Sequence, residues 1–190
     1  MTPAWSDALD FAETVAAARD GDERAFTALW RWLHPSLVRY LRVVTTMESD
    51  DLASEVWLSV AQGLDRFSGD ERAFRAWVFT IARHRVVDAA RRRARRVADT
   101  APLSAIDPPA PGDAASEALI RMELGASLEI IRSLPPAQAD VISLRVIGGL
   151  SVTETATVLA KSEGAVRVLA HRGLRELADR LSALSRTSVG

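Results

Sequence analysis

The 190-residue chain contains no cysteine, which excludes disulfide bonds and thiolate metal sites and is compatible with a reducing compartment. Long uncharged runs are also missing: the longest is nine residues, Val56 to Leu64, whereas a membrane-spanning helix needs about 20 apolar residues. The first residues, MTPAWSDALDFAETV, lack the basic segment followed by an apolar segment that marks a signal peptide. We therefore expect a cytoplasmic protein that does not insert into a membrane.

Recognisable enzyme motifs are absent as well. The three histidines are isolated in the sequence, and there is no metal-ligand cluster, glycine-rich phosphate loop or nucleophile motif. We therefore predict no catalytic residues and no metal or other cofactor. What is present is a globular composition, 48% apolar, with room for one ordinary domain or two small ones.

Charge is distributed unevenly, although the formal net charge is only -1. Residues 47–71 carry seven acidic side chains and one arginine, a net charge of -6, whereas residues 83–96 carry seven arginines and one aspartate, a net charge of +6. A single partner of one sign would not use both segments. The sequence therefore predicts two different partner surfaces, one of which binds something anionic.

Apolar residues recur at spacings of three and four along almost the whole chain, which predicts an all-α fold. The pattern is interrupted at residues 97–116, which contain no basic side chain and four of the eight prolines. Helix cannot continue through these prolines, because each lacks an amide donor and has a fixed backbone torsion. We predict two small helical domains, residues 6–96 and 117–184, joined by a flexible proline-rich linker, residues 97–116.

The second domain contains the pattern of a helix-turn-helix. The segment SVTE, residues 151–154, is a capping box, in which the serine and glutamate side chains satisfy backbone amides at the start of a helix. A turn at AKSEG and a longer basic helix, capped by Ser162, would follow. The second helix of such a motif can enter the major groove of DNA, but helical hairpins are also common in other all-α proteins.

Longer segments of both domains resemble one family. The segment LPPAQADVISLRVIGGLSVTETATVLAKSEGAVRVLAHRGLREL is similar to region 4 of extracytoplasmic-function (group IV) sigma factors of the RNA polymerase sigma-70 family. The first domain resembles region 2 in AFTALWRWLHPSLVRYLR, DDLASEVWLSV and FRAWVFTIARHRVVDAARR. The resemblance implies an alternative sigma factor that binds core RNA polymerase and directs promoter-specific initiation. Such a protein is not an enzyme and has no small-molecule substrate. Its implied partners are core polymerase, promoter DNA and an anti-sigma factor.

The resemblance also implies which residues bind core polymerase. An acidic helical face would meet a basic partner surface and surround an apolar centre formed by Leu52 and Val56. From the residues alone, an ordinary solvated first turn of a helix remains the alternative. Ser54 stands where the family usually has glutamine. The residues implied for core polymerase are Asp50, Asp51, Leu52, Glu55 and Val56.

The -10 promoter element would be read by the basic helix and the loop before it. Opening a duplex requires contacts to phosphates and pockets or stacking surfaces for unstacked bases. Trp77 falls on an apolar stripe with Phe74, Val78 and Ile81, so we predict that it packs in the core rather than against a base. His84 replaces the family's usual asparagine. The implied residues are Arg66, Phe67, Ser68 and Gly69 in the loop, and Arg75, Arg83, His84, Arg91 and Arg92 on the helix.

The -35 element would be read by the second helix of the helix-turn-helix. Val166, Ala170, Gly173 and Leu177 match the family's inward positions. Val168 and Leu169 stand where many members have serine and arginine. The implied DNA-binding residues are Ser162, Glu163, Arg167, His171 and Arg172, with His171 open to the alternative of an ordinary surface histidine.

Two other classes of function compete with a promoter-specificity subunit. A stand-alone helix-turn-helix regulator would use the second domain equally well, but the acidic helix and the region 2-like domain would then have no purpose. An enzyme or a basic membrane-surface protein has little support, because the helix before residues 91–96 buries aromatic residues in a globular pattern.

Overall fold

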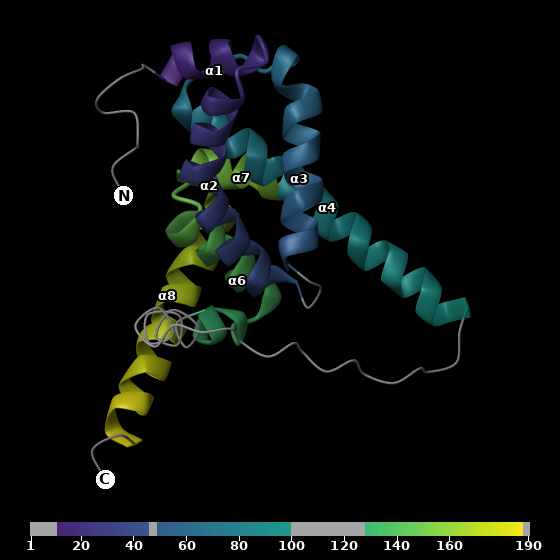
Figure 1. Cartoon of the computed structure of the whole chain (residues 1–190). Helices are drawn as coiled ribbons and strands as arrows, with labels where there is room; N and C mark the ends of the chain where they lie inside the picture. The colour runs from purple at the N-terminus through teal and green to yellow at the C-terminus, as the bar shows by residue number, and fades with distance from the viewer. Residues whose placement is uncertain (1–10, 46–48, 100–127, 188–190) are drawn as a thin grey trace.

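The computed structural model describes residues 11–45, 49–99 and 128–187, and in these residues the chain folds as helices joined by turns (Figure 1). The prediction of an all-α fold is confirmed. We call residues 11–99 the first module and residues 128–187 the second module. Residues 97–99, predicted as linker, continue helix α4, and the rest of the predicted linker lies outside the described residues. The predicted domain boundaries therefore stay a prediction.

The first module contains α1 (Phe11–Arg19), α2 (Glu23–Val44), α3 (Ser49–Gly63), the 3-10 turn η1 (Leu64–Arg66) and α4 (Glu71–Asp99). Aspartates cap two of the helices. The Asp22 carboxylate accepts from the Arg24 amide at 2.7 Å, and the Asp70 carboxylate accepts from the Ala73 amide at 2.8 Å. These caps satisfy backbone donors that have no partner inside the helix. Local sequence thus explains where α2 and α4 begin.

The core of the first module is built around Phe74 of α4, which is fully buried. Its ring makes edge contacts with Phe11, Phe67 and Trp77, at centroid distances of 5.7, 5.3 and 5.7 Å. Trp77 is half-buried and packs against this core, as the apolar stripe predicts. Aromatic pairs in such edge-on arrangements add stability beyond the area they bury.

The second module contains a helical stretch at residues 128–132, α6 (Pro136–Ile142), the π-helical turn η2 (Ser143–Ile147), α7 (Val152–Leu159) and α8 (Glu163–Thr187). A Cβ atom added at Gly173 of α8 would lie 2.8 Å from Cγ1 of Ile142. Glycine is therefore needed for the close approach of α8 to α6.

The helix-turn-helix is formed by α7 and α8, and its predicted capping box is confirmed. The Ser151 hydroxyl accepts from the Glu154 amide at 3.1 Å, and the Glu154 carboxylate accepts from the Ser151 amide at 2.5 Å. The two helices are linked by the Thr153 hydroxyl, which donates to the Glu163 carboxylate at 2.6 Å. The sequence at each helix start therefore fixes both the beginning of α7 and its position against α8.

Replacing Ser151 by alanine is expected to lower the free energy of unfolding of the second module by about 1 kcal/mol, because one backbone amide of α7 loses its acceptor. Urea denaturation followed by circular dichroism measures the change. The matched control is Ser54→Ala, because the Ser54 hydroxyl bonds only the Asp50 carbonyl one turn earlier. That control should change stability by less than about 0.5 kcal/mol. Equal effects of the two variants would contradict the capping role.

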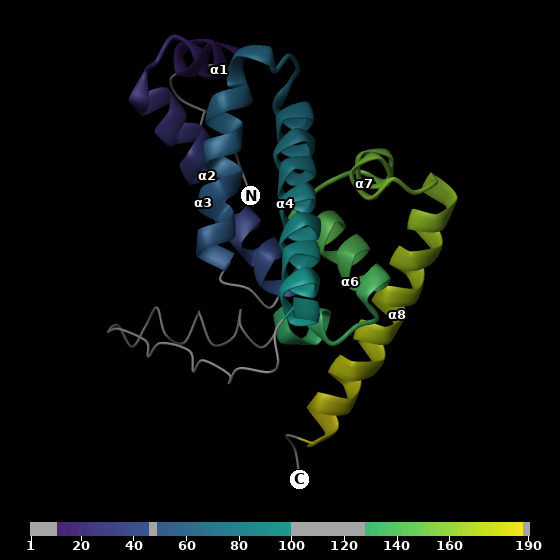
Figure 2. The same cartoon turned by 90° about the vertical axis from the view of Figure 1, so that its right-hand side faces the viewer.

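Helix α4 is the helix of the first module that lies against α7 of the second module. Figure 2 shows α3 on one side of α4, and α6 and α7 on the other side. The C-terminal end of α4 projects beyond the other helices (Figure 1). The second module therefore packs against the first half of α4 and also against α2, whose Val43 belongs to one buried cluster with Leu134 and Ile142. Residues 90–95 of α4 are exposed or half-exposed.

Candidate functional site

The acidic face of α3 is exposed, but two of its predicted members are not. Asp50, Asp51 and Glu55 lie at the surface. Leu52 and Val56 are buried in the core of the first module, so they do not form the apolar centre of an exposed surface in this conformation. Leu52 and Val56 are four residues apart and therefore share one face of α3, which is the buried face, whereas the acids lie on the exposed face.

An apolar side chain that the sequence analysis missed does lie on the acidic face of α3. Leu58 is 60% exposed and follows Asp51 and Glu55 at the i, i+4, i+7 spacing. This helical spacing is the feature of the sequence from which Leu58 could have been identified as a member of the face. Leu58 therefore replaces Leu52 and Val56 as the apolar member of the face.

A second missed feature is an aromatic pair on α2. Trp30 is 38% exposed and stacks on His34, with ring centroids 4.2 Å apart. Burial lowers the pKa of His34, and the nearby Asp50 carboxylate opposes this shift. The pair therefore lies beside the acidic start of α3 and extends that surface onto α2.

In the loop before α4, three of the four residues predicted to bind the -10 element are exposed to solvent. Arg66, Ser68 and Gly69 are exposed. Phe67 is buried instead and stacks on Trp77, with centroids 5.1 Å apart and ring planes 24° apart. Phe67 is therefore part of the core, and the prediction that it receives a base is not met in this conformation. The ring turns inward because the aromatic core around Phe74 offers it more apolar contact than solvent does.

Gly69 has φ of +149°, and an added Cβ atom would lie 2.6 Å from Cβ of Ala73. The loop approaches the first turn of α4 so closely that only glycine fits there. A substitution at Gly69 would therefore move Ser68 and Arg66 as well.

The exposed end of α4 carries three of the predicted DNA-binding residues. His84 and Arg91 are exposed, and Arg92 is half-exposed. Arg91 lies 3.8 Å from Asp88, and Arg92 lies 3.9 Å from Glu55 of the acidic face. Ion pairs between exposed side chains are worth little, so both arginines can exchange these contacts for a phosphate. The predicted acidic and basic surfaces meet at the Glu55–Arg92 pair.

The other two predicted arginines of α4 are covered. The Arg75 side chain is 22% exposed, pairs with Glu71 at 2.8 Å and lies over the Trp32 ring at 5.0 Å. The Arg83 side chain is 27% exposed and pairs with Asp140 of the second module at 3.0 Å. Both lie on the part of α4 that packs against the second module, so neither faces solvent as its neighbours His84 and Arg91 do.

The predicted -35 residues share the outer face of the helix-turn-helix. Ser162 caps α8 by accepting from the Ala165 amide at 3.2 Å. Arg167, His171 and Arg172 are exposed, whereas Val166 is fully buried. Hydrogen bonds from Thr153 and then from Arg167 lower the pKa of Glu163, which keeps the carboxylate charged. The arrangement offers an exposed basic helix face that is fixed in place by the preceding helix.

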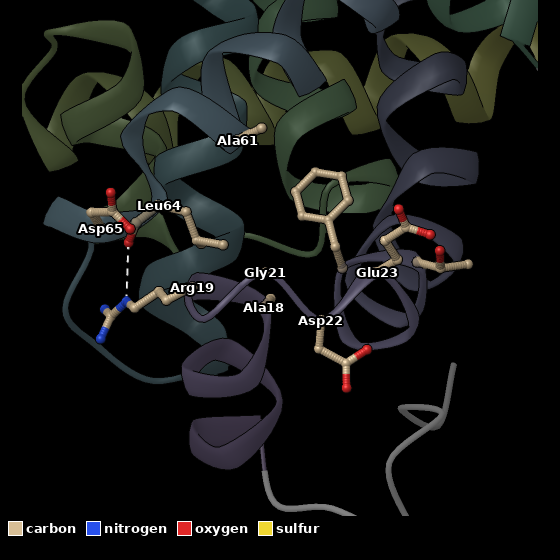
Figure 3. Close-up of a pocket in the computed structure, with 10 residues that line it drawn as sticks. Ala18, Arg19, Gly21, Asp22, Glu23, Ala61, Leu64 and Asp65 are labelled. Atoms are coloured by element: carbon tan, nitrogen blue, oxygen red, sulfur yellow. Dashed lines mark hydrogen bonds between the residues drawn. The ribbon is translucent and has the colours of Figure 1, made fainter.

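A hollow of about 530 Å³ lies at the α1–α2 turn of the first module (Figure 3). The Arg19 guanidinium closes one side by donating to the Leu64 carbonyl at 3.1 Å. None of the predicted functional residues lines it. The lining residues are Ala18, Arg19, Gly21, Asp22, Glu23, Phe26, Thr27, Ala61, Leu64 and Asp65.

The described residues contain no helix that is both long enough and apolar enough to cross a membrane. Within residues 11–45, 49–99 and 128–187, no group of three or more histidine, aspartate or glutamate side chains is placed to hold a metal ion.

Comparison with known proteins relates this geometry to one family. Residues 8–172 match the family model described as ECF sigma factor. The chain is 37% identical over 178 residues to the ECF RNA polymerase sigma factor SigD of Mycobacterium tuberculosis, covering 89% of this chain and 82% of that protein. It is 35% identical to the ECF RNA polymerase sigma factor ShbA of Streptomyces griseus, covering 86% of this chain and 91% of that protein.

Two solved structures are also similar to this chain. CnrH in complex with the cytosolic domain of CnrY matches with a TM-score of 0.62 at 26% identity, over 92% of this chain and 97% of that chain. The sigma factor RpoE, in complex with the anti-sigma factor NepR from Bartonella quintana, matches with a TM-score of 0.63 at 21% identity, over 84% of this chain and 98% of that chain. The second likeness concerns the fold alone.

Proposed function

Because the chain belongs to the ECF sigma factor family, and is thus an alternative sigma factor that directs transcription, we propose that it divides this work among three surfaces. The acidic face of α3 binds core RNA polymerase, the loop before α4 and the basic side of α4 hold the -10 element, and α8 reads the -35 element. No step of this proposal requires catalysis by the chain itself.

The observation that carries the proposal is the pair of differently charged surfaces in the first module. Asp50, Asp51 and Glu55 are exposed on α3, whereas Arg91 and Arg92 lie on the projecting half of α4. A stand-alone DNA-binding regulator would need only the helix-turn-helix. An acidic face beside a basic helix is the arrangement expected for a protein that binds a polymerase and a promoter together.

Transcription by reconstituted polymerase tests the proposal directly. Core polymerase with the purified chain should give transcripts with defined starts, which sequencing identifies, and each component alone should give none. The competing proposal of a stand-alone regulator makes the opposite prediction. In that case the chain would protect a two-fold symmetric DNA site without polymerase.

A further partner that we propose is an inhibitory protein. The solved relatives CnrH and RpoE are bound to CnrY and to an anti-sigma factor, respectively. We propose that this chain is likewise held by an anti-sigma factor until it is needed. Co-purification from cells that express the tagged chain, with identification of a stoichiometric protein other than polymerase, tests this part.

Replacing Arg91 by alanine is expected to reduce the salt slope of promoter binding by the holoenzyme by about 0.7 to 0.9, because one phosphate contact and its released counterion are lost. The measurement is promoter affinity over a series of salt concentrations. Arg24→Ala is the control, because Arg24 is also an exposed arginine but lies in the first turn of α2 and is not one of the predicted DNA-binding residues. An unchanged slope for Arg91→Ala would make Arg91 an ordinary solvated residue at a helix end.

A further inference from the structure

The basic outer face of α8 has an apolar residue at its centre. Figure 2 shows α8 at the edge of the molecule, and its first turns carry the exposed residues Arg167, His171 and Arg172. Val168 lies among them and is 50% exposed. Residues three and four positions apart are neighbours on a helix surface, so a partner that binds His171 and Arg172 also meets Val168. Single exposed apolar residues are common on proteins, and Val168 therefore carries an inference only together with a second feature.

The second feature is Gly164, which is exposed one helical turn before Val168. Apart from its own helix backbone and its chain neighbours, a Cβ atom added there would meet only the Ser162 hydroxyl oxygen, at 4.0 Å. Gly164 is not among the residues with positive φ either. Gly173 of the same helix differs, because its added Cβ atom would lie 2.8 Å from Ile142. Within the part of the chain that the structure describes, neither packing nor backbone conformation thus requires glycine at position 164.

The absence of a side chain at Gly164 leaves the helix backbone uncovered beside Val168. Glycine is less favourable than alanine inside a helix, and one use of glycine is to let a ligand approach the backbone closely. Gly164 and Val168 therefore form one exposed apolar patch, with open backbone at one end and an aliphatic side chain at the other. Valine strongly prefers one rotamer in a helix, so this side chain presents a fixed surface to a partner.

The polar side chains next to the apolar patch are engaged with each other. The Glu163 carboxylate accepts from the Thr153 hydroxyl at 2.6 Å and from the Arg167 guanidinium at 2.5 Å. Gly164 and Val168 have no polar side-chain atoms of their own. The patch can therefore give a partner close apolar contact, whereas the surrounding basic side chains attract negative charge.

We infer that the apolar patch formed by Gly164 and Val168 contacts the methyl group of a thymine in the -35 element. DNA matches the basic surroundings of the patch. In the major groove, the C5-methyl of thymine is the apolar group by which a base is recognised, and it is read by contact with apolar side chains. This inference rests on the proposed function of α8 and adds to it one base and the two residues that select it.

The first experiment identifies the thymine. Holoenzyme reconstituted from core polymerase and the full chain selects bound fragments from a library in which the -35 region of a promoter, located by its transcript starts, is randomised. Sequencing should show a preference for thymine at one position on one strand. Val168→Ser should abolish this preference and leave the other positions unchanged. An identical profile for the wild-type chain and Val168→Ser would overturn the inference.

Leu181→Ser is the matched control for Val168→Ser. Leu181 is 51% exposed, close to the exposure of Val168, and lies near the other end of α8. The variant therefore makes a comparable change from an apolar to a polar side chain outside the patch. It should keep the preference for thymine. If Leu181→Ser also abolished the preference, the effect would not belong to the patch and the inference would fail.

The second experiment removes the methyl group alone. Deoxyuridine in place of the selected thymine keeps the base pair and all hydrogen-bonding groups but lacks the C5-methyl. Promoter affinity of the wild-type holoenzyme should fall about fourfold, the factor expected when one buried methyl-sized group is lost. Holoenzyme containing Val168→Ser should bind both promoters equally. A wild-type holoenzyme that does not distinguish deoxyuridine from thymine would refute the contact.

The third experiment tests the close approach at Gly164. Gly164→Ala should weaken promoter binding by the holoenzyme about fivefold or more, because the added methyl group overpacks the contact with DNA. It should not lower the stability of the second module, since alanine is favoured in helices. Gly173→Ala should destabilise the second module instead, because its Cβ atom would meet Ile142. Unchanged promoter affinity for Gly164→Ala would contradict the close approach.

The experiments also separate this inference from the proposed function. A holoenzyme that initiates at defined starts but shows no base preference anywhere in the -35 region would refute the reading role of α8, and the inference would fall with it. A holoenzyme that selects a -35 element but is insensitive to the thymine methyl group would refute the inference alone, and the proposed function of α8 would stand.

Discussion

Replacing Phe74 by alanine is expected to lower the free energy of unfolding of the first module by about 3 to 5 kcal/mol. Phe74 is fully buried, and its ring contacts those of Phe11, Phe67 and Trp77. Truncation would leave a cavity bounded by three rings from α1, from the loop before α4 and from α4 itself. These rings also pack against other residues of the same core, which limits how far they can move into the space.

Intrinsic fluorescence measures this loss selectively, because all five tryptophans lie between residues 5 and 77 and the second module has none. Denaturation followed by tryptophan emission therefore reports the first module, and circular dichroism reports both modules. Leu58→Ala is the control, because Leu58 is 60% exposed and its truncation removes little buried area. A loss below about 1 kcal/mol for Phe74→Ala would contradict the central position of the ring.

The features that the sequence predicts well are local ones. The capping box at Ser151 and Glu154 involves residues three positions apart, and its hydrogen bonds form as the pattern indicates. The stripe through Phe74 and Val78 is equally local, because helical spacing alone determines which residues share a face. In both cases the determining interaction lies within one or two turns of helix, so the neighbouring residues are sufficient to identify it.

The features that the sequence does not predict depend on contacts between distant segments. Phe79 is fully buried although it lies outside the predicted stripe, because a second face of α4 packs against Tyr40 and the second module. Arg83 looks like any other arginine of a basic helix until Asp140 is brought to it from 57 residues away. Helical periodicity reports one buried face, and it cannot report a second face that another module covers.

Side-chain direction explains the remaining differences. The family resemblance implies a partner surface for Leu52 and Val56 and a flipped base for Phe67. All three are buried in the first module. An apolar residue among polar neighbours is as often the inward member of an amphipathic helix or the anchor of a loop as it is a contact residue. The charged members of the same segments stay at the surface, because their burial without partners is costly.

Reversing two charges on the acidic face of α3 is expected to weaken the binding of core polymerase at least tenfold. The variant is Asp50→Lys combined with Asp51→Lys, both of which change exposed side chains in the first turn of α3. Opposed like charges across an interface cost several kcal/mol, and a tenfold loss corresponds to about 1.4 kcal/mol. Glu55 is left unchanged, because its contact with Arg92 would confuse an effect on polymerase with an effect on DNA.

The control carries the same reversal of two charges at another surface, Glu13→Lys combined with Asp20→Lys on α1 and the turn after it, where both residues are exposed. Affinity for core polymerase is measured for both variants at low and at high salt. The defect of the α3 variant should shrink as salt rises, since the range of charge interactions falls from about 10 Å at 0.1 M to about 3 Å at 1 M. Equal losses in the two variants would mean that net charge, rather than the face formed by Asp50 and Asp51, determines binding. A defect of the α3 variant that persists unchanged at high salt would instead assign the loss to the packing of α3.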